Sequence, residues 1–345
     1  MRPVKTRFLP GDFIADRYKV ERVLGQGGMG VVYLVNDQKT DAPRALKTLR
    51  PRYMTDENAM RRFTREVRAL RQLDHPAIVK IYEARRIGPL LFYTMDYIEG
   101  KSLSAWLRQR KRLGLGSTVR VLALVAHALE HAHTVTIHRD ISPENVMVLR
   151  DGSVRLLDFG LAKLEDQQGA FTMMGDRLGK VQYKAPEQTV NAASVDARAD
   201  LYSLGVMFFM LLAGRLPKPG ERLTDAVPGL PRECDAFVEK AMAQSPDDRF
   251  ATAREFRLAL MDVYQARPRK QQRAAPQQHV EAPPPPPEEG TLRRLLKRLS
   301  RLWAKLAGAR ARRPRQARSN QTASGILAKG RAGQRGPSST SRTLR

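Results

Sequence analysis

The sequence has little cysteine and no long apolar run. Cys234 is its one cysteine, so no disulfide can form within the chain, which suits a reducing compartment. The N-terminus lacks the apolar stretch of roughly 7–15 residues that a signal peptide needs. The most apolar run, residues 201–214, is shorter than the roughly 20 residues of a membrane span and predicts a buried helix. We therefore expect a cytoplasmic protein without a signal peptide or transmembrane segment.

Acidic residues are scarce near the C-terminus. Residues 266–345 hold 20 of the 61 Lys and Arg but only 3 of the 35 Asp and Glu, which gives them a net charge of +17 out of +26. Such a polycation directs attention to acidic partners, namely nucleic acid, anionic lipid or an acidic protein.

The same region divides by composition into three parts. Residues 265–290 include five consecutive prolines and predict an extended Pro-rich linker. Residues 291–308 place leucines and Trp303 at helical spacing among Arg and Lys, which predicts a basic amphipathic helix. That helix suits an anionic inner-membrane surface, a protein partner or this chain's own globular part. Residues 309–345 predict a disordered basic tail. Nucleic acid is disfavoured because no folded nucleic-acid motif accompanies the tail.

Hydrophobic periodicity changes near residue 102. Before it, alternating patterns predict two strands in 18–35 and further strands at 44–50, 78–84 and 90–98, and helical spacing predicts a helix at 56–73 with Asp56 as N-cap. After it, helical patterns dominate, interrupted by short strands around 146–149 and 154–157. The pattern predicts a small β-rich lobe followed by a larger helical lobe.

A glycine cluster, GQGGMGVV at residues 25–32, joins the first two expected strands. Glycines let a backbone approach phosphates closely enough for its N–H groups to donate to oxygen. A dinucleotide site would need a helix to begin at the third glycine, whereas the next residues, VVYLV, predict a strand. The cluster therefore favours a glycine hairpin that lies over a nucleotide.

Five further residues supply polar chemistry in a fixed order. Lys47 lies in an otherwise apolar strand and needs an anionic partner, which Glu66 in the next helix can supply. Asp140, in HRDISPEN at 138–145, can accept a proton from an attacking hydroxyl. Asn145, in the same stretch, and Asp158, in LLDFG, offer hard oxygen ligands suited to Mg²⁺.

This ordered set, closed by APE at 185–187, resembles the protein kinase catalytic domain, and the eukaryotic-like Ser/Thr kinases of bacteria in particular. The resemblance covers residues 11–264. It is supported by LDHPAIVKIYE (73–83), MDYIEGKSL (95–103), KAPEQ (184–188), DLYSLGV (200–206) and SPDDRF (245–250). It implies an α+β, bilobal protein kinase fold, ATP with Mg²⁺ or Mn²⁺ as cofactors, and protein substrates.

The resemblance also implies a role for each matching position. The glycine loop would cover the ATP phosphates, Lys47 would contact them and pair with Glu66, Asp140 would deprotonate the substrate hydroxyl, and Asn145 and Asp158 would hold the metal. The implied nucleotide-binding set is Gly25, Gln26, Gly27, Gly28, Gly30, Val32, Ala45, Lys47, Met95, Asp96, Ile98 and Met147. Leu70, Ile81, His138 and Phe159 would stack as a spine anchored by Asp200, and Glu187 would pair with Arg249.

One position departs from the pattern. Ser/Thr kinases carry a lysine where this chain has Ser142, and a threonine beside it in space where this chain has Lys180, in GKVQYKAPE. We read this as a reciprocal exchange in which Lys180 restores the missing charge. The alternative is a solvated Lys180 and a crippled enzyme. Tyrosine kinases carry an arginine at the position of Glu144, so that class is disfavoured.

Thr172 is the candidate activating phosphosite, because an added phosphate could pair with Arg139; an unmodified threonine is the alternative. A pseudokinase scaffold that binds nucleotide and partner proteins without efficient turnover remains the alternative function. A small-molecule kinase is disfavoured by KAPEQ.

Overall fold

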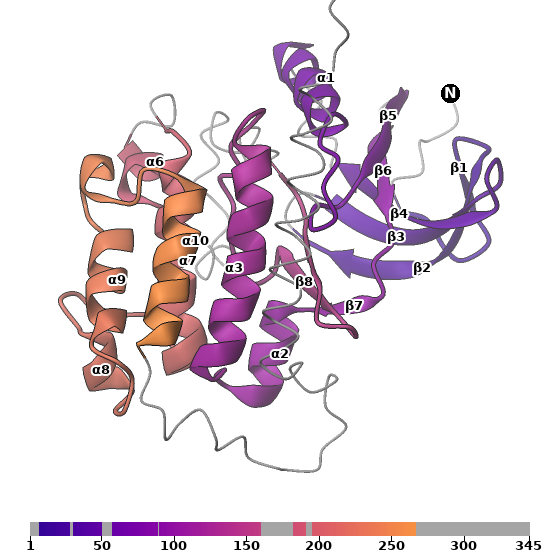
Figure 1. Ribbon diagram of the computed structural model, residues 1–345. Helices are drawn as coiled ribbons and strands as arrows, with labels where there is room; N and C mark the ends of the chain where they lie inside the picture. The colour runs from indigo at the N-terminus through magenta and orange to yellow at the C-terminus, as the bar shows by residue number, and fades with distance from the viewer. Residues whose placement is uncertain are drawn as a thin grey trace, which may run out of the picture. The chain divides into compact units, whose positions relative to one another are not determined.

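The computed structural model describes residues 7–27, 30–49, 57–88, 90–159, 182–190 and 195–266. The chain divides into two units, residues 1–286 and 287–345, and every described residue belongs to the first. Within that unit, a small lobe of strands, drawn in indigo and purple, precedes a larger lobe of helices (Figure 1). The predicted α+β, bilobal fold is confirmed.

The small lobe is built on an antiparallel sheet in the order β1-β2-β3-β4-β6-β5. Its strands are β1 (Phe13–Ile14), β2 (Tyr18–Gln26), β3 (Gly30–Asp37), β4 (Ala42–Leu49), β5 (Ile81–Ile87) and β6 (Leu90–Asp96). One face buries Tyr33, Leu46 and Phe92 in a cluster of its own, because alternate side chains of a strand share a face. The opposite face carries Lys47 and belongs to the main core and the site.

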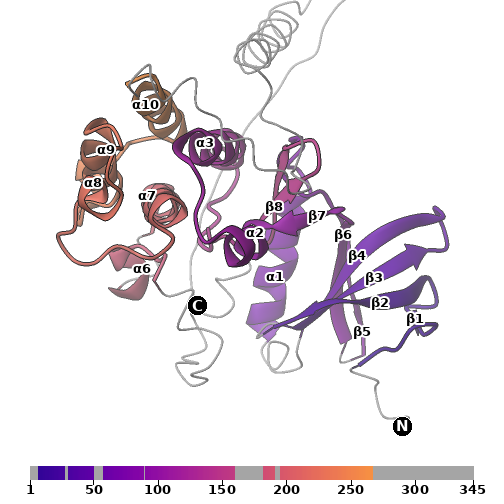
Figure 2. The same ribbon diagram turned by 90° about the horizontal axis from the view of Figure 1, so that it is seen from below.

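Helix α1 (Glu57–Leu70) belongs to that second face (Figure 2). Phe63, Val67 and Leu70 are buried at helical spacing, as the sequence predicted. The helix is shorter than the predicted 56–73, and its predicted N-cap, Asp56, lies outside the described residues.

The strand predicted at 78–84 begins later, at Ile81, for a tertiary reason. The backbone N–H of Val79 donates to the Leu156 carbonyl at 3.0 Å, and Leu156 N–H donates to the Ala77 carbonyl at 2.8 Å. Ile78 forms an isolated parallel bridge with Leu156. Residues 77–79 therefore join the small lobe to a strand of the large one.

The large lobe contains mostly helices and one small sheet. Its helices are α2 (Leu103–Arg110), α3 (Leu115–Ala132), α6 (Pro186–Val190), α7 (Arg198–Ala213), α8 (Leu223–Ala226), α9 (Glu233–Ala241) and α10 (Ala253–Gln265). The sheet has the order β7 (Gly100–Ser102), β8 (Val146–Leu149) and β9 (Val154–Leu156). The buried helix predicted from the run at 201–214 is confirmed as α7.

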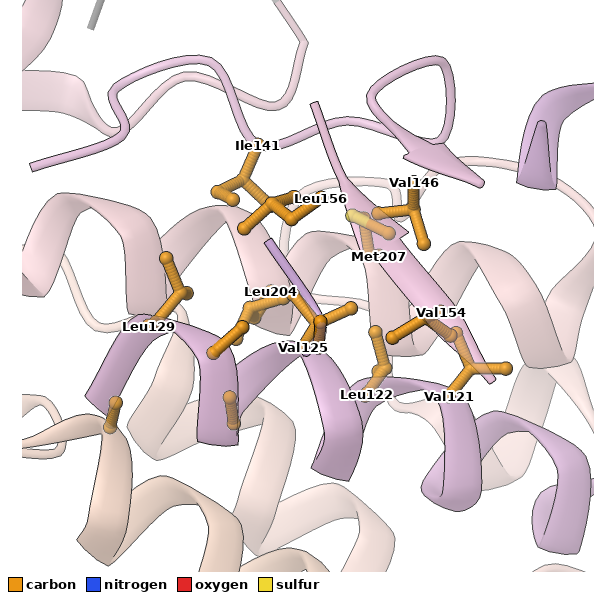
Figure 3. Packing of buried hydrophobic residues seen from close by; sticks show 14 of the residues in the cluster. Val121, Leu122, Val125, Leu129, Ile141, Val146, Val154, Leu156, Leu204 and Met207 are labelled. Carbon is orange, nitrogen blue, oxygen red and sulfur yellow. The ribbon is translucent and has the colours of Figure 1, made fainter. Parts of the chain in front are cut away.

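The core of the large lobe lies between α3, α7 and the β8–β9 hairpin (Figure 3). Val125 and Leu129 of α3 meet Leu204 of α7, while Val154 and Leu156 cover them from the hairpin. All five side chains are buried, so the hairpin that precedes Asp158 rests on a packed base.

Three further sequence features concern membrane spans, the single cysteine and the C-terminal region. Across the described ranges, no helix has the length and apolar character needed to cross a membrane. Cys234 is buried in α9, and burial, together with Asp235 and Glu233, raises the pKa of its thiol to about 12. The linker, the amphipathic helix and the basic tail predicted for 265–290, 291–308 and 309–345 lie beyond residue 266, outside the described residues, save the linker's first two.

Candidate active site

The sheet contributes Lys47 and Tyr93 to the site. The two residues are directly opposite each other on β4 and β6, so their side chains share one face of the sheet. Lys47 Nζ lies 2.7 Å from Asp158 Oδ2, and the Tyr93 hydroxyl donates to Asp158 Oδ1 at 2.8 Å. Glu66 lies half-buried in α1, and its expected pairing with Lys47 stays a prediction.

The loop at 138–145 is fixed from below by Asp200 of α7. Its carboxylate accepts hydrogen bonds from the backbone N–H of His138 at 2.9 Å and of Arg139 at 2.7 Å, and contacts His133 Nε2 at 2.9 Å. Burial opposes ionisation of Asp200, but these partners outweigh it and lower its pKa. Arg139 sits at φ 65°, a conformation that a non-glycine residue adopts only when its surroundings hold it there.

His138 is a packed core histidine. Its ring centroid lies 4.5 Å from that of Phe159, its Nε2 donates to the Leu157 carbonyl, and its Nδ1 accepts from the backbone N–H of Asp140. One neutral tautomer satisfies both bonds, and burial lowers the pKa of the ring. Its contact with Phe159 is the stacking that the family resemblance implied for these two residues.

Asp140 and Asn145 are joined directly. Asn145 Nδ2 donates to the Asp140 carbonyl at 2.7 Å and to its Oδ2 at 2.9 Å. The amide nitrogen of Asn145 is thereby committed to Asp140, so its oxygen is the atom left for a ligand. Asn145 is 4% exposed, which holds this orientation.

The donors present fit Mg²⁺ in their chemistry. The amide oxygen of Asn145 and the carboxylate of Asp158 are hard oxygen ligands, which Mg²⁺ prefers. No group of three or more His, Cys, Asp or Glu that could hold a metal occurs in the described part of the chain. Two protein ligands leave positions for water and nucleotide phosphate, which is how Mg²⁺ is usually bound.

Ser142 is 1% exposed, and its carbonyl accepts a hydrogen bond from the backbone N–H of Asn145 at 3.0 Å. Its hydroxyl oxygen is buried and makes no hydrogen bond to any residue that the structure describes. A buried hydroxyl without a partner is costly, which makes Ser142 an acceptor with capacity for a donor. Lys180, which was predicted to restore the charge missing at this position, and Thr172 both lie outside the described residues.

The glycines expected over the phosphates have different local reasons. A Cβ atom on Gly30 would lie 1.7 Å from the backbone oxygen of Thr48 on the neighbouring strand. A Cβ atom on Gly25 or Gly27 would meet nothing within 4 Å. Close packing of β3 against β4 therefore requires glycine at position 30, whereas the structure has room for a side chain at positions 25 and 27. Gln26 ends β2, and Gly28 lies outside the described residues.

The residues expected around adenine come from both lobes. Ala45 lies opposite Met95 in the β4–β6 pairing, and both are buried, while Val32 lies opposite Lys47. Met147, half-buried in β8, approaches from the large lobe. Ile98 is half-buried after the end of β6.

Asp96, at the end of β6, is already engaged through its N–H. That group donates to the Lys80 carbonyl at 3.0 Å, so a backbone bond from Asp96 to a nucleotide would have to use the carbonyl. The Asp96 carboxylate accepts from the Tyr82 hydroxyl at 2.6 Å, which holds this side chain against β5.

Three residues of the expected spine line a small pocket, together with Met95. The pocket is lined by Leu70, Leu73, Ile78, Val79, Ile81, Tyr93, Met95, Asp158 and Phe159. Leu70, Ile81 and Phe159 thus come together as predicted, with His138 against Phe159 and Asp200 below.

The expected pair of Glu187 and Arg249 is present. Arg249 Nη1 and Nη2 donate to the two Glu187 carboxylate oxygens at 2.7 and 2.8 Å. Burial opposes ionisation of Glu187, but Arg249 outweighs it and lowers the pKa of the carboxyl.

Sequence reasoning missed two residues. Gln188 Nε2 donates to the Arg139 carbonyl at 2.9 Å and so joins α6 to the loop. Tyr93 was missed because its contact with Asp158 depends on the register of β6, which residue types alone do not give. Its position as a hydroxyl inside the apolar strand LLFYTMD was the available signal.

Comparison with known proteins agrees with this geometry. The protein kinase domain family matches residues 18–256. The serine/threonine-protein kinase PknB of Mycobacterium tuberculosis is 33% identical over 276 residues, which cover 74% of this chain and 44% of PknB. PrkC of Bacillus subtilis is 31% identical over 274 residues, with 75% of this chain and 42% of PrkC covered. The chain thus spans less than half the length of these curated relatives. The crystal structure of the Mycobacterium tuberculosis PknI kinase domain is similar, with a TM-score of 0.63, 31% identity and coverage of 74% of this chain and 100% of that one.

Proposed function

Because this chain belongs to the protein kinase family, we propose that it transfers phosphate from Mg·ATP to serine or threonine hydroxyls of proteins. The observation that carries the proposal is a pair of contacts between expected site residues, one that joins the two lobes and one within the loop at 138–145. Lys47 meets Asp158 at 2.7 Å, and Asn145 meets Asp140 at 2.9 Å. A pseudokinase would not need to keep all four.

Each residue has a defined task in this proposal. Mg·ATP, when bound, supplies the phosphoryl group and neutralises part of its charge. Lys47 holds the phosphates, Asn145 and Asp158 hold the metal, and Asp140 accepts the proton of the substrate hydroxyl. Positioning and electrostatics provide most of the rate enhancement in phosphoryl transfer. The Asn145 bond to Asp140 Oδ2 contributes by keeping that carboxylate oriented.

We further propose that Lys180 supplies the charge that is missing at Ser142. Support comes from the exchange in the sequence and from the buried Ser142 hydroxyl, which has no partner in the described residues. A lysine ammonium has three donors, so it can bond this hydroxyl and still face the transferring phosphate. Thr172 is proposed as the autophosphorylated residue that pairs with Arg139.

The test is autophosphorylation of the purified chain with radiolabelled ATP and Mg²⁺. Wild type should label, and Asp158→Asn should abolish labelling. Lys180→Ala should lower the rate about 100-fold or more, the effect of losing one electrostatic contact in a transition state. The exposed turn residue Lys39 provides a matched control, since Lys39→Ala should label like wild type.

A second pair of variants separates the exchange from general damage. If Lys180 replaces the loop lysine, Ser142→Lys combined with Lys180→Thr should recover activity that Lys180→Ala loses. Equal labelling by Lys180→Ala and wild type would refute the exchange. A wild-type protein that binds ATP but labels neither itself nor myelin basic protein would favour the scaffold function instead.

We propose that residues 291–308 attach the chain to an anionic membrane surface, with a protein partner as the other candidate. Sedimentation with vesicles of anionic lipid should retain the full chain but not a chain ending at residue 290. Neutral vesicles are the control, and retention by neither would leave the protein partner.

A further inference from the structure

Two hydrogen-bond donors mounted side by side on the sheet converge on one carboxylate. Lys47 and Tyr93 are cross-strand neighbours, and each binds a different oxygen of Asp158, at 2.7 and 2.8 Å. Asp158 itself adopts φ 55°, which costs free energy for a residue with a side chain. Because both oxygens of the Asp158 carboxylate accept a hydrogen bond, the orientation of its plane is fixed.

Tyr93 has little freedom to do anything else. It is 1% exposed, and its ring packs against Phe63 of α1 with centroids 6.3 Å apart. Its hydroxyl donates to the Asp158 carboxylate at 2.8 Å. A phenol is protonated near neutral pH, so it acts as a donor to that carboxylate.

The two donors differ in what they do once nucleotide binds. Lys47 carries a charge and a flexible stem, and the proposed function assigns it to the phosphates. The Tyr93 side chain is uncharged and enclosed, so it stays at Asp158 when nucleotide binds and does not move to the phosphates. When the Lys47 side chain moves from Asp158 to the phosphates, the Tyr93 hydroxyl would remain as the donor on the sheet that orients the Asp158 carboxylate for the metal.

We propose that the Tyr93 hydroxyl is a positioning residue, which holds the Asp158 carboxylate in the orientation that binds Mg²⁺ after Lys47 has moved to the nucleotide. The inference rests on the proposed function, because it concerns the metal of Mg·ATP. It assigns a share of the metal affinity to a strand residue in the small lobe, in addition to the proposed ligands Asn145 and Asp158.

The test measures metal-dependent nucleotide binding without turnover. ADP binding to the full chain is followed by calorimetry across a series of MgCl₂ concentrations and in EDTA. Tyr93→Phe should raise the Mg²⁺ concentration for half-maximal tightening about tenfold, equivalent to about 1.4 kcal/mol. ADP affinity in EDTA should stay within about twofold of wild type, since no metal is involved.

Matched variants distinguish this role from simple packing. Tyr33→Phe removes another buried hydroxyl from the same sheet, on the face away from the site, and should leave the Mg²⁺ requirement unchanged. Tyr93→Met keeps an apolar side chain without a hydroxyl and should shift the requirement like Tyr93→Phe.

The possible results separate the two proposals. A Mg²⁺ requirement of Tyr93→Phe and Tyr93→Met within twofold of wild type would overturn the positioning role and leave the kinase proposal intact. If wild type itself shows no Mg²⁺-dependent tightening of ADP, the proposed function fails, and the inference fails with it.

Discussion

The two lobes hold their functional groups by different means. In the small lobe, Lys47 and Tyr93 project from paired strands, and the sheet register alone sets them side by side. In the large lobe, Asp140, Asn145 and Asp158 lie outside regular strands and helices, in loops whose backbone needs other support. That support is buried and polar: Asp200 binds the backbone on one side, and His138 fills the space between the loops.

This difference predicts which substitutions will destabilise each lobe. Strand residues are held by many repeated backbone bonds, so one side chain matters only through its own contact or clash. The loops depend on a few buried groups, each of which satisfies several donors at once. A single substitution at one of these buried groups can therefore disturb the loops that carry Asp140, Asn145 and Asp158.

The largest effect is expected from Asp200→Ala. It leaves the N–H groups of His138 and Arg139 buried without an acceptor and removes the partner of His133. We expect a loss of about 3–5 kcal/mol in the free energy of unfolding, measured by urea denaturation. Autophosphorylation should be lost as well. Asp225→Ala, at an exposed position in α8, is the control, and equal stability of the two variants would contradict the idea that Asp200 supports the loops.

A smaller effect in the small lobe should separate two glycines. Gly30→Ala places a Cβ atom 1.7 Å from the Thr48 oxygen, so β3 and β4 must move apart, at a cost of about 1–3 kcal/mol. Gly25→Ala meets nothing within 4 Å and should change stability by less than about 0.5 kcal/mol. Thermal unfolding checks both. If Gly25→Ala loses ATP binding at unchanged stability, Gly25 serves the nucleotide and Gly30 serves the sheet. Equal destabilisation by the two substitutions would contradict this difference between the glycines.

The smallest effect concerns pH and the carboxyl of Asp37, at the end of β3. The hydrogen bond from Arg17 lowers the pKa of Asp37 from 3.8 to about 2. The pair therefore stabilises the fold fully above about pH 4 and loses that contribution as the pH falls toward 2, because the unfolded chain takes up the proton first. Asp37→Asn should cost about 1 kcal/mol at pH 6, after allowance for the partly exposed Arg17.

Urea unfolding across this pH range gives the measurement for Asp37. The stability difference between wild type and Asp37→Asn should shrink as the pH falls from 4 to 2. Asp16→Asn, at an exposed turn position, provides the control. A difference that stays constant over that range would exclude linkage through this carboxyl.

Much of the fold followed from local patterns. The strands, the helix at 57–70 and the buried helix α7 follow periodicity, and the family motifs ordered the site residues along the chain. The strand at 81–87 began late because residues 77–79 pair with β9, a contact between segments far apart in sequence. β1 and β7 were not predicted, since two or three residues carry too little periodicity to read.

The sequence by itself determined which residue types stand at each motif position, including the absence of lysine at 142 and its presence at 180. Only the tertiary structure decided that Tyr93 reaches Asp158, that Gly30 is demanded by Thr48, and that Ser142 has a buried hydroxyl. The physical reason is that motifs and periodicity act within one segment. Strand register, backbone clashes and burial arise where distant segments pack, and no spacing along the chain encodes them directly.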